Sequence, residues 1–226
     1  MKKNKIIILS ALLIFAVNCL YSQKISIVDG YIQQRATISA FGEKYPSYYH
    51  GRKSGVNVQL DYKNNFSLLT GVLYSVVYSS NLQRFAVIDS IYTGTVSTYT
   101  FGHSLDVPIR AKYTLELPKE WKLFAFAGPN VNVGIAMTQH VDASLNPGTN
   151  DLIDDLWGRK YKTGVEDLYK SALIHRINFQ LGVGGGVQWK KYQVQAGYDF
   201  GVNNLSRMDS HKLRTGGWWV SLAYQF

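Results

Sequence analysis

Histidines are the residues of this sequence best suited to act as a general base near neutral pH, and there are five of them. Serine-based hydrolysis also needs a serine within hydrogen-bond reach of that base. His103 and Ser104 are adjacent, so in a β-strand they point to opposite faces and cannot pair. No Gly-x-Ser-x-Gly setting accompanies the other four, which are His50, His140, His175 and His211. The pattern favours a protein without enzymatic activity and leaves a lipid-modifying enzyme as an alternative.

Two further clusters could hold a ligand. The run 182–187 (GVGGGV) is rich in glycine but does not complete G-x-G-x-x-G, because Val187 stands where the third glycine belongs. Asp151, Asp154 and Asp155 could bind Ca²⁺, although their spacing does not match an EF-hand loop. We therefore expect no cofactor and no metal, and we interpret the glycines as small residues that let a β-wall bend around a narrow interior.

Charged residues recur on the polar face of the strands that the sequence predicts. An isolated buried charge is costly, so charges that share an interior should pair with each other. We predict a polar network inside the protein, and its members are Asp61, Asp106, Arg110, Lys112, Glu116, Arg176 and Asp199. A polar path for ions or a small solute is the alternative reading of the same residues.

The elements that would position these charges are β-strands. From Leu105 to Glu116 the odd positions are apolar, while the even positions are polar or proline. This is the period of a strand, because a helix would mix the two sets around its axis. Clean or partly broken versions of the pattern predict seven more strands, over 32–41, 55–62, 66–78, 121–137, 176–189, 192–201 and 218–226. Pro108 cannot donate to a ladder, so we expect a bulge or an unpaired neighbour there.

The connections alternate in length. Tight turns are predicted at 63–65, 117–120 and 190–191, and longer connections at 42–50, 79–102, 138–174 and 203–215. Outer-membrane barrels alternate short periplasmic turns with longer outer loops in this way. Residues 84–91 and 95–101 could form a further hairpin that lengthens the wall or raises the strand number to ten. In the loop 138–174, the apolar spacing of Leu152–Trp157 and of Val165–Ala172 indicates short amphipathic helices.

Alternation alone does not say which face is outside. In a lipocalin-like carrier the apolar face would point inward, whereas in a membrane barrel it points to lipid. The polar face is rich in Gly, Gln and Asn, which suits a crowded lumen, and an aromatic residue ends the chain. Aromatic residues also gather beside the short turns, as an interfacial girdle would. The predicted girdle is Tyr62, Tyr113, Trp121, Trp189, Tyr192 and Phe226. The fold class that results is all-β, an eight-stranded antiparallel up-and-down transmembrane β-barrel with long outer loops.

Composition agrees with this interpretation. The 226 residues are 46% hydrophobic, 14% aromatic and only 17% charged, and they include a single cysteine. Residues 1–22 have a basic start and a short apolar run, which predicts a secretory signal peptide followed by one barrel domain over 23–226. A lipid on Cys19 is the alternative use of this segment. Removing the signal leaves no cysteine. It also lowers the net charge from +9 to +6, and this modest charge argues against a nucleic-acid partner.

Three stretches resemble a known family: 105–113 (LDVPIRAKY), 126–135 (FAGPNVNVGI) and 182–205. Together they are similar to the PorT-like outer-membrane β-barrel family of Bacteroidetes-type bacteria. That family has a Pro-containing strand, an Ala-Gly-Pro strand start and a Gly-rich hairpin ending in Gly-x-x-Asn. The resemblance implies a barrel in the outer membrane of a Gram-negative cell, and PorT itself is associated with protein secretion. Gly197 is a departure, since family members often have Arg there.

From these observations we expect a non-enzymatic outer-membrane barrel with both termini in the periplasm and a structural, anchoring or secretion-accessory role. Its specificity would lie in the outer loops. The expected partners are outer-membrane lipid and lipopolysaccharide, the barrel assembly machinery that recognises a terminal aromatic residue, and secretion or envelope proteins. A porin-like passive channel for small solutes is the main alternative.

Overall fold

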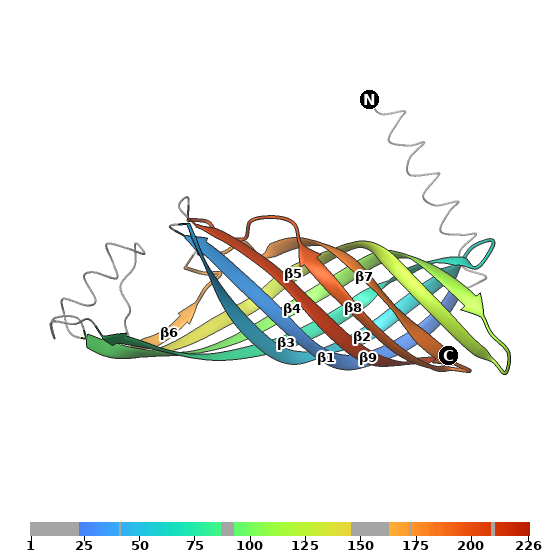
Figure 1. Ribbon diagram of the computed structural model, residues 1–226, viewed down its shortest axis with the longest axis horizontal. Helices are drawn as coiled ribbons and strands as arrows, with labels where there is room; N and C mark the ends of the chain where they lie inside the picture. Colours follow the sequence, from blue (N-terminus) through green and yellow to red (C-terminus); the bar gives the residue numbers. More distant parts are fainter. Residues whose placement is uncertain (1–22, 41, 87–92, 146–162, 172, 209–210) are drawn as a thin grey trace, which may run out of the picture.

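The chain forms a closed eight-stranded antiparallel barrel (Figure 1). The computed structural model describes residues 23–40, 42–86, 93–145, 163–171, 173–208 and 211–226. The wall consists of β1 (Gln23–Ala40), β2 (Glu43–Asp61), β3 (Phe66–Ala86), β4 (Thr93–Glu116), β5 (Trp121–Leu145), β7 (Ile177–Trp189), β8 (Tyr192–Gly201) and β9 (Lys212–Gln225). Each strand pairs with its neighbour, and β9 pairs with β1 to close the ring. The predicted strand number and fold class are confirmed.

A ninth strand, β6 (Gly164–Asp167), lies outside the ring. It pairs with β5 at Thr138–Val141, beyond the stretch of β5 that pairs with β7. The predicted helix over Val165–Ala172 is wrong where the chain is described, because residues 164–167 are extended and a turn follows them. The candidate helix over Leu152–Trp157 and the acidic residues 151–155 lie outside the described residues, as do the predicted signal segment 1–22 and Cys19.

Three tight turns connect strands at one end of the barrel, here called the short-turn end. Asn64 and Asn65 adopt positive φ between β2 and β3, as do Lys119 and Glu120 between β4 and β5. Asparagine tolerates this left-handed conformation better than most residues. The start of β1 and the carboxyl-terminal Phe226 lie at the same end, since the Phe226 amide donates to the carbonyl of Ile25. The opposite end is here called the long-loop end.

Several residues predicted as loops are strands at the long-loop end. The β1–β2 connection is short, because β2 begins at Glu43 and pairs with β1 from there. Likewise β3 continues to Ala86 and β4 starts at Thr93, so the hairpin over 84–101 lengthens the wall and adds no strand to the ring. These stretches escaped prediction because they carry Ser, Thr, Tyr and Lys on both faces. Strands that rise out of the membrane need no apolar outer face.

The ladder is irregular near Pro108. Pairing of β3 with β4 stops at Thr70↔Ile109 and resumes at Leu73↔Asp106, which leaves unpaired neighbours where they were expected. The register shift between β4 and β5 lies elsewhere, between His103 and Ser104. The bulge is therefore separate from the proline.

The barrel is polar inside and apolar outside. Gln, Asn, Ser and charged residues dominate the buried side chains, whereas Ile, Leu, Val and aromatic residues dominate the exposed large ones. In β9 the odd positions from Trp219 to Gln225 point into the lumen, and the even positions from Trp218 to Phe226 point outward. This order is the reverse of a soluble barrel and places lipid around the wall. Among the described residues no helix is long and apolar enough to cross a membrane.

Candidate functional site

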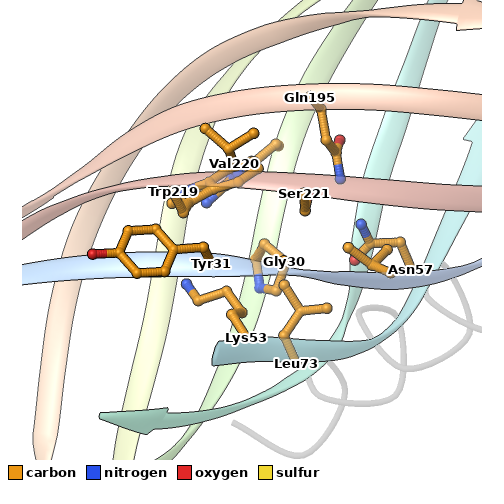
Figure 2. Close-up of a pocket in the computed structure, with 12 residues that line it drawn as sticks. Gly30, Tyr31, Lys53, Asn57, Leu73, Gln195, Trp219, Val220 and Ser221 are labelled. Atoms are coloured by element: carbon orange, nitrogen blue, oxygen red, sulfur yellow. The ribbon is translucent and has the colours of Figure 1, made fainter. Parts of the chain in front are cut away.

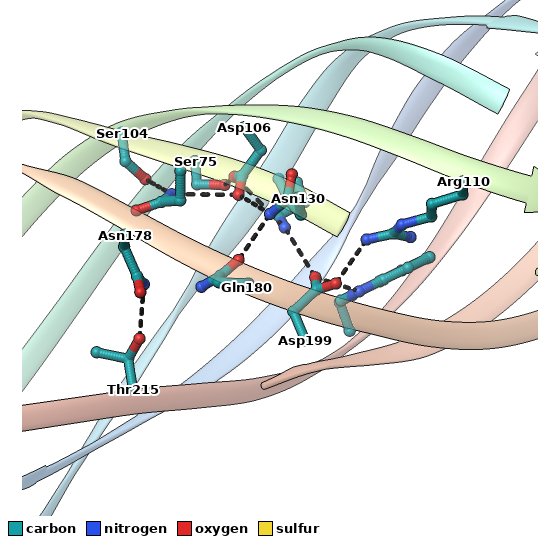
Figure 3. Close-up of polar contacts among 12 residues, drawn as sticks. Ser75, Ser104, Asp106, Arg110, Asn130, Asn178, Gln180, Asp199 and Thr215 are labelled. Atoms are coloured by element: carbon teal, nitrogen blue, oxygen red, sulfur yellow. Dashed lines mark hydrogen bonds and ion pairs between the residues drawn. The ribbon is translucent and has the colours of Figure 1, made fainter. Parts of the chain in front are cut away.

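A cluster of charges crosses the middle of the lumen (Figure 3). The guanidinium of Arg110 in β4 donates from Nη2 to Oδ1 of Asp199 in β8 at 2.6 Å. Lys53 in β2 lies between two carboxylates, with Nζ 3.4 Å from Asp106 Oδ2 and 3.6 Å from Asp199 Oδ2. All four side chains are almost fully buried. The pairs join three strands of the ring, so they act as struts across the interior.

Amides and a hydroxyl complete the shell around Asp106. Ser75 Oγ donates to Asp106 Oδ2 at 2.9 Å, while Asn130 and Asn132 donate to Oδ1 at 2.8 and 3.1 Å. Asn130 also donates to Gln180 Oε1 at 2.6 Å. A buried carboxylate that accepts several hydrogen bonds besides its cation remains charged at little cost. The arrangement is that of a structural network.

Aromatic rings close the space beside the charges. Phe126 in β5 and Trp219 in β9 stack at a centroid distance of 5.8 Å and an interplanar angle of 7°. The Arg110 guanidinium carbon lies 5.1 and 5.3 Å from the two ring centroids, within cation–π range. Trp219 Nε1 donates to Asp199 Oδ2 at 2.9 Å. We call the set Lys53, Asp106, Arg110, Phe126, Asp199 and Trp219 the central plug.

Glycines make room for the plug. A Cβ at Gly182 would lie 2.3 Å from Asp199 Oδ1, and one at Gly184 would lie 2.5 Å from Phe126 Cζ. The Gly-rich run of β7 is thus the wall against which lumen side chains pack. Gly197 faces Trp219, whose Cζ2 would be 2.7 Å from an added Cβ. The tryptophan occupies the space that an arginine at position 197 would need, and the lumen cation comes from Arg110 instead.

The other residues of the predicted network lie outside the plug. Lys112 Nζ donates to Gln59 Oε1 at 2.9 Å and lies 4.0 Å from the centre of the Phe124 ring, nearer the short-turn end. Asp61 pairs with Lys24 at 2.5 Å. Glu116 is exposed and pairs with Lys122 at 2.8 Å on the rim, so its placement in the lumen network is wrong. It ends β4, where the strand leaves the interior.

Arg176 lies at the long-loop end. It donates from Nη1 to the carbonyl oxygens of Gly134 and Ile135, and its guanidinium carbon lies 4.6 Å from the centre of the Tyr169 ring. Tyr169 in turn packs on Gly134, where an added Cβ would collide with the phenol. Burial raises the pKa of the Tyr169 phenol above its ordinary value, and the nearby charge of Arg176 offsets only part of this rise. Arg176 therefore fastens the segment after β6 to the wall and is not part of the plug.

Sequence reasoning missed Lys53 and Trp219 as lumen residues. Lys53 follows the same phase as Gly55, Asn57 and Gln59, but the predicted strand began at residue 55. Extending the alternation by two residues would have found it. Trp219 shares the polar face of its strand with Ser221, so the period-two alternation alone places it in the lumen.

The predicted girdle residues all lie on the outside of the barrel. Trp121 and Trp189, which flank two short turns, stack at 6.1 Å, and Tyr192 packs on Tyr224 at 5.3 Å. Each of the predicted residues is at least 39% exposed, and the set is Tyr62, Tyr113, Trp121, Trp189, Tyr192 and Phe226. Exposed aromatic rings at one end of a lipid-facing wall suit the membrane interface.

The residues of the serine–histidine alternative are kept apart. His103 Nδ1 is hydrogen-bonded to Tyr74 Oη at 2.7 Å on the outer face. Ser104 Oγ instead accepts a hydrogen bond from Asn132 in the lumen at 2.9 Å. The described residues contain no group of three His, Cys, Asp or Glu side chains that could hold a metal ion.

Cavities flank the plug and differ in size. Two small cavities that touch it measure about 20 Å³ each, the space of roughly one water molecule, and Figure 2 shows one of them with Trp219 and Lys53 among the residues around it. A much larger cavity of about 600 Å³ occupies the long-loop half of the barrel. The lumen is therefore wide on one side of the plug and closed at its middle.

The chain is similar to several solved structures, all at low sequence identity. No curated protein matches the chain. Among solved structures, Ail of Yersinia pestis in complex with the heparin analogue sucrose octasulfate has 14% identity and a TM-score of 0.37, and the match covers 91% of this chain and 99% of Ail. Neisserial surface protein A has 14% identity and a TM-score of 0.36 over 88% and 97% of the chains. OprG of Pseudomonas aeruginosa has 10% identity and a TM-score of 0.33 over 91% and 96%.

The match to a sequence family is more informative. Residues 25–207 match the family described as outer membrane protein beta-barrel domain. The matched stretch begins in β1 and ends between β8 and β9, so it covers most of the wall and the whole central plug except Trp219. The chain belongs to this outer membrane protein beta-barrel domain family, and its place is the outer membrane.

Proposed function

We propose that this protein is a non-conducting, non-enzymatic outer-membrane barrel that anchors a raised β-sheet at its long-loop end, in a structural or secretion-accessory role. The central plug is the observation that carries the proposal. Its charges and rings come from β2, β4, β5, β8 and β9, so they bridge the lumen from several sides. An eight-stranded barrel is narrow enough for side chains to fill it.

A passive channel is less well supported. The cavities that touch the plug hold about 20 Å³ each, which is too little for a hydrated solute. Moving the plug aside would separate Arg110 from Asp199 and Lys53 from both of its carboxylates. Unpaired buried charges are costly, so the closed state is favoured.

A lipid-modifying enzyme is also less well supported. His103 and Ser104 serve different faces of the wall and have other partners, Tyr74 and Asn132. A Ser–His catalytic pair needs both side chains within hydrogen-bond reach.

The anchoring role rests on strand length. β3, β4 and β5 have 21, 24 and 25 residues, whereas a strand needs about 9–11 residues to cross a membrane. Their surplus lies at the long-loop end, where Figure 1 shows them extending past the rest of the wall together with β6. A sheet raised in this way offers edges and faces to envelope proteins. The resemblance to PorT-like barrels favours a secretion partner among them.

A deletion tests the anchoring role. Replacing residues 81–98 with Asn-Gly removes the raised β3–β4 hairpin and keeps the wall below it. We expect the variant to run as a heat-modifiable band in the outer-membrane fraction, while secretion or surface display of exported proteins in the native host decreases. A folded variant that leaves protein export and envelope composition unchanged would contradict the anchoring role.

A further inference from the structure

The large cavity in the long-loop half of the barrel, here called the outer cavity, has a volume of about 600 Å³. Cavities that bind small molecules measure about 300–1,000 Å³. Residues of β1, β2, β3, β4, β5, β7 and β9 line it, together with the chain segments around Tyr169 and Leu205. It lies on the far side of the central plug from the short turns, so nothing in the plug fills it.

Apolar atoms form most of the surface of the outer cavity, although Ser, Thr, Gln and His residues also line it. Around Gln188, Gln193 and Gln225 the lumen is lined by carboxamides that bond to each other. In the outer cavity, apolar side chains from four separate parts of the chain converge instead, and they include Ile38, Met137, Leu168, Leu173, Leu205 and Leu213. Covering an apolar surface inside a polar lumen with an apolar molecule is favourable, because it removes that surface from water.

The floor of the outer cavity is polar and contains an unsatisfied group. Gln34, Ser104, Asn132 and Asn178 line the cavity on the side of the plug. Asn178 is only 2% exposed, and its Nδ2 donates to Thr215 Oγ1 at 2.7 Å. Its Oδ1 has no hydrogen-bond partner among the described residues. A buried carbonyl oxygen without a donor is costly, so this position favours a ligand with an O–H or N–H group.

Charge narrows the class of ligand. The described lining contains no aspartate or glutamate, so no described carboxylate offers a counter-ion to a buried ammonium group. The one arginine among the described lining residues is Arg176. Its guanidinium already donates to the carbonyls of Gly134 and Ile135 and stacks on Tyr169, so it is not free to pair with an anion. A neutral polar group fits this floor better than either charged one.

We propose that the outer cavity binds a neutral amphiphile, with its apolar body against the leucine-rich wall and a hydroxyl or amide group that donates to Asn178 Oδ1. This site goes beyond the anchoring role and does not depend on it, because a non-conducting barrel needs no ligand. The bound molecule enters from the long-loop end and stops at the plug.

The chain offers natural probes for this site. It has three methionines, and the two beyond the predicted signal, Met137 and Met208, both line the outer cavity. Protein labelled at the methionine methyl carbons and held in phosphatidylcholine nanodiscs therefore reports the cavity directly. The Met137→Leu and Met208→Leu variants assign the signals. Decan-1-ol, decanoate and decylammonium serve as probes with one tail length and three heads, compared at equal concentration in the lipid.

We expect decan-1-ol to shift both methyl signals saturably, at a concentration about tenfold below the other two probes. Asn178→Leu should abolish this preference, and Ala36→Phe, which fills the cavity, should abolish the saturable shifts. Ala127→Phe adds the same ring to the lipid-facing side and should leave binding unchanged. Shifts that never saturate, that are equal for all heads, that are largest for a charged head, or that survive Asn178→Leu unaltered would each overturn the proposal.

Discussion

Arg110 and Asp199 face each other across the lumen, with the guanidinium Nη2 2.6 Å from the carboxylate Oδ1 and both side chains about 5% exposed. They are 89 residues apart in the sequence and lie on strands separated by β5 and β7. Asp199 also accepts from Trp219 and lies near Lys53. One carboxylate thus joins side chains from β2, β4 and β9 across the lumen.

Removing one member of this pair should destabilise the barrel strongly. We expect Arg110→Met and Asp199→Leu each to lower the free energy of unfolding by about 3–5 kcal/mol, because the remaining partner is left buried and uncompensated. The double variant should lose much less than the sum. Urea titration of the protein refolded into lipid vesicles measures this. Lys122→Met, which removes the exposed pair with Glu116, serves as control and should change little. Additive losses would contradict the direct pairing.

Gly182 should tolerate no side chain. An added Cβ would lie 2.3 Å from Asp199 Oδ1 and 2.9 Å from Arg110 Nη2, so Gly182→Ala must displace the ion pair. We expect a loss of about 1–3 kcal/mol in the same unfolding assay, the usual cost of overpacking. Gly102→Ala is the matched change, because its Cβ would meet a Val77 methyl at 3.1 Å and no backbone atom closer than 4.0 Å. Equal effects of the two substitutions would show that Gly182 is not special.

Tyr169 should hold the segment after β6 against the wall at Gly134. Gly134→Ala places a Cβ where the phenol lies, so we expect this segment to detach and trypsin to cleave after Lys170 several-fold faster. Mass spectrometry of the fragments identifies the cleavage site. Tyr169→Ala should have the same effect, and the double variant should be cleaved no faster than Tyr169→Ala alone. Unchanged cleavage in both single variants would contradict the contact.

Trp121 and Trp189 should stabilise the barrel jointly at the short-turn end. Their rings stack at 6.1 Å on the outer face. We expect the two alanine variants to be coupled by about 0.5–1.5 kcal/mol in vesicles, as stacked aromatic pairs are. Both variants should also insert into vesicles more slowly, because interfacial aromatic residues anchor a membrane protein. Strictly additive losses with unchanged insertion would argue against a girdle.

The period-two pattern made the wall predictable from sequence. Lipid on one side and a crowded lumen on the other force residues such as Leu105 and Asp106 to alternate, and this signal is absent where strands leave the membrane. In β2 the outward positions Arg52 and Ser54 are polar, so the strand seemed to begin at residue 55 and Lys53 was missed. The same limit hid the start of β4, where Ser and Thr occur on both faces.

Which lumen side chains contact each other was harder to predict than which side chains face the lumen. Asp106, Arg110 and Asp199 were expected to face inward, and the structure brings them together with Lys53. Glu116 follows the same phase but stands at the end of β4, where Lys122 in the next strand is nearer than any lumen charge. The depth of a residue along a strand depends on the shear of the barrel, which one sequence does not reveal. The outer cavity depends on chain segments far apart in sequence and gave no local signal.

The most direct test of the closed lumen is the single-channel current of the wild-type protein in planar lipid bilayers. The plug predicts no stable stepwise openings at moderate voltage, while the Phe126→Ala/Trp219→Ala double variant, which removes both rings, should show measurable conductance if it folds to a heat-modifiable band. Regular, long-lived openings of the wild-type protein would contradict a closed lumen and favour a passive channel.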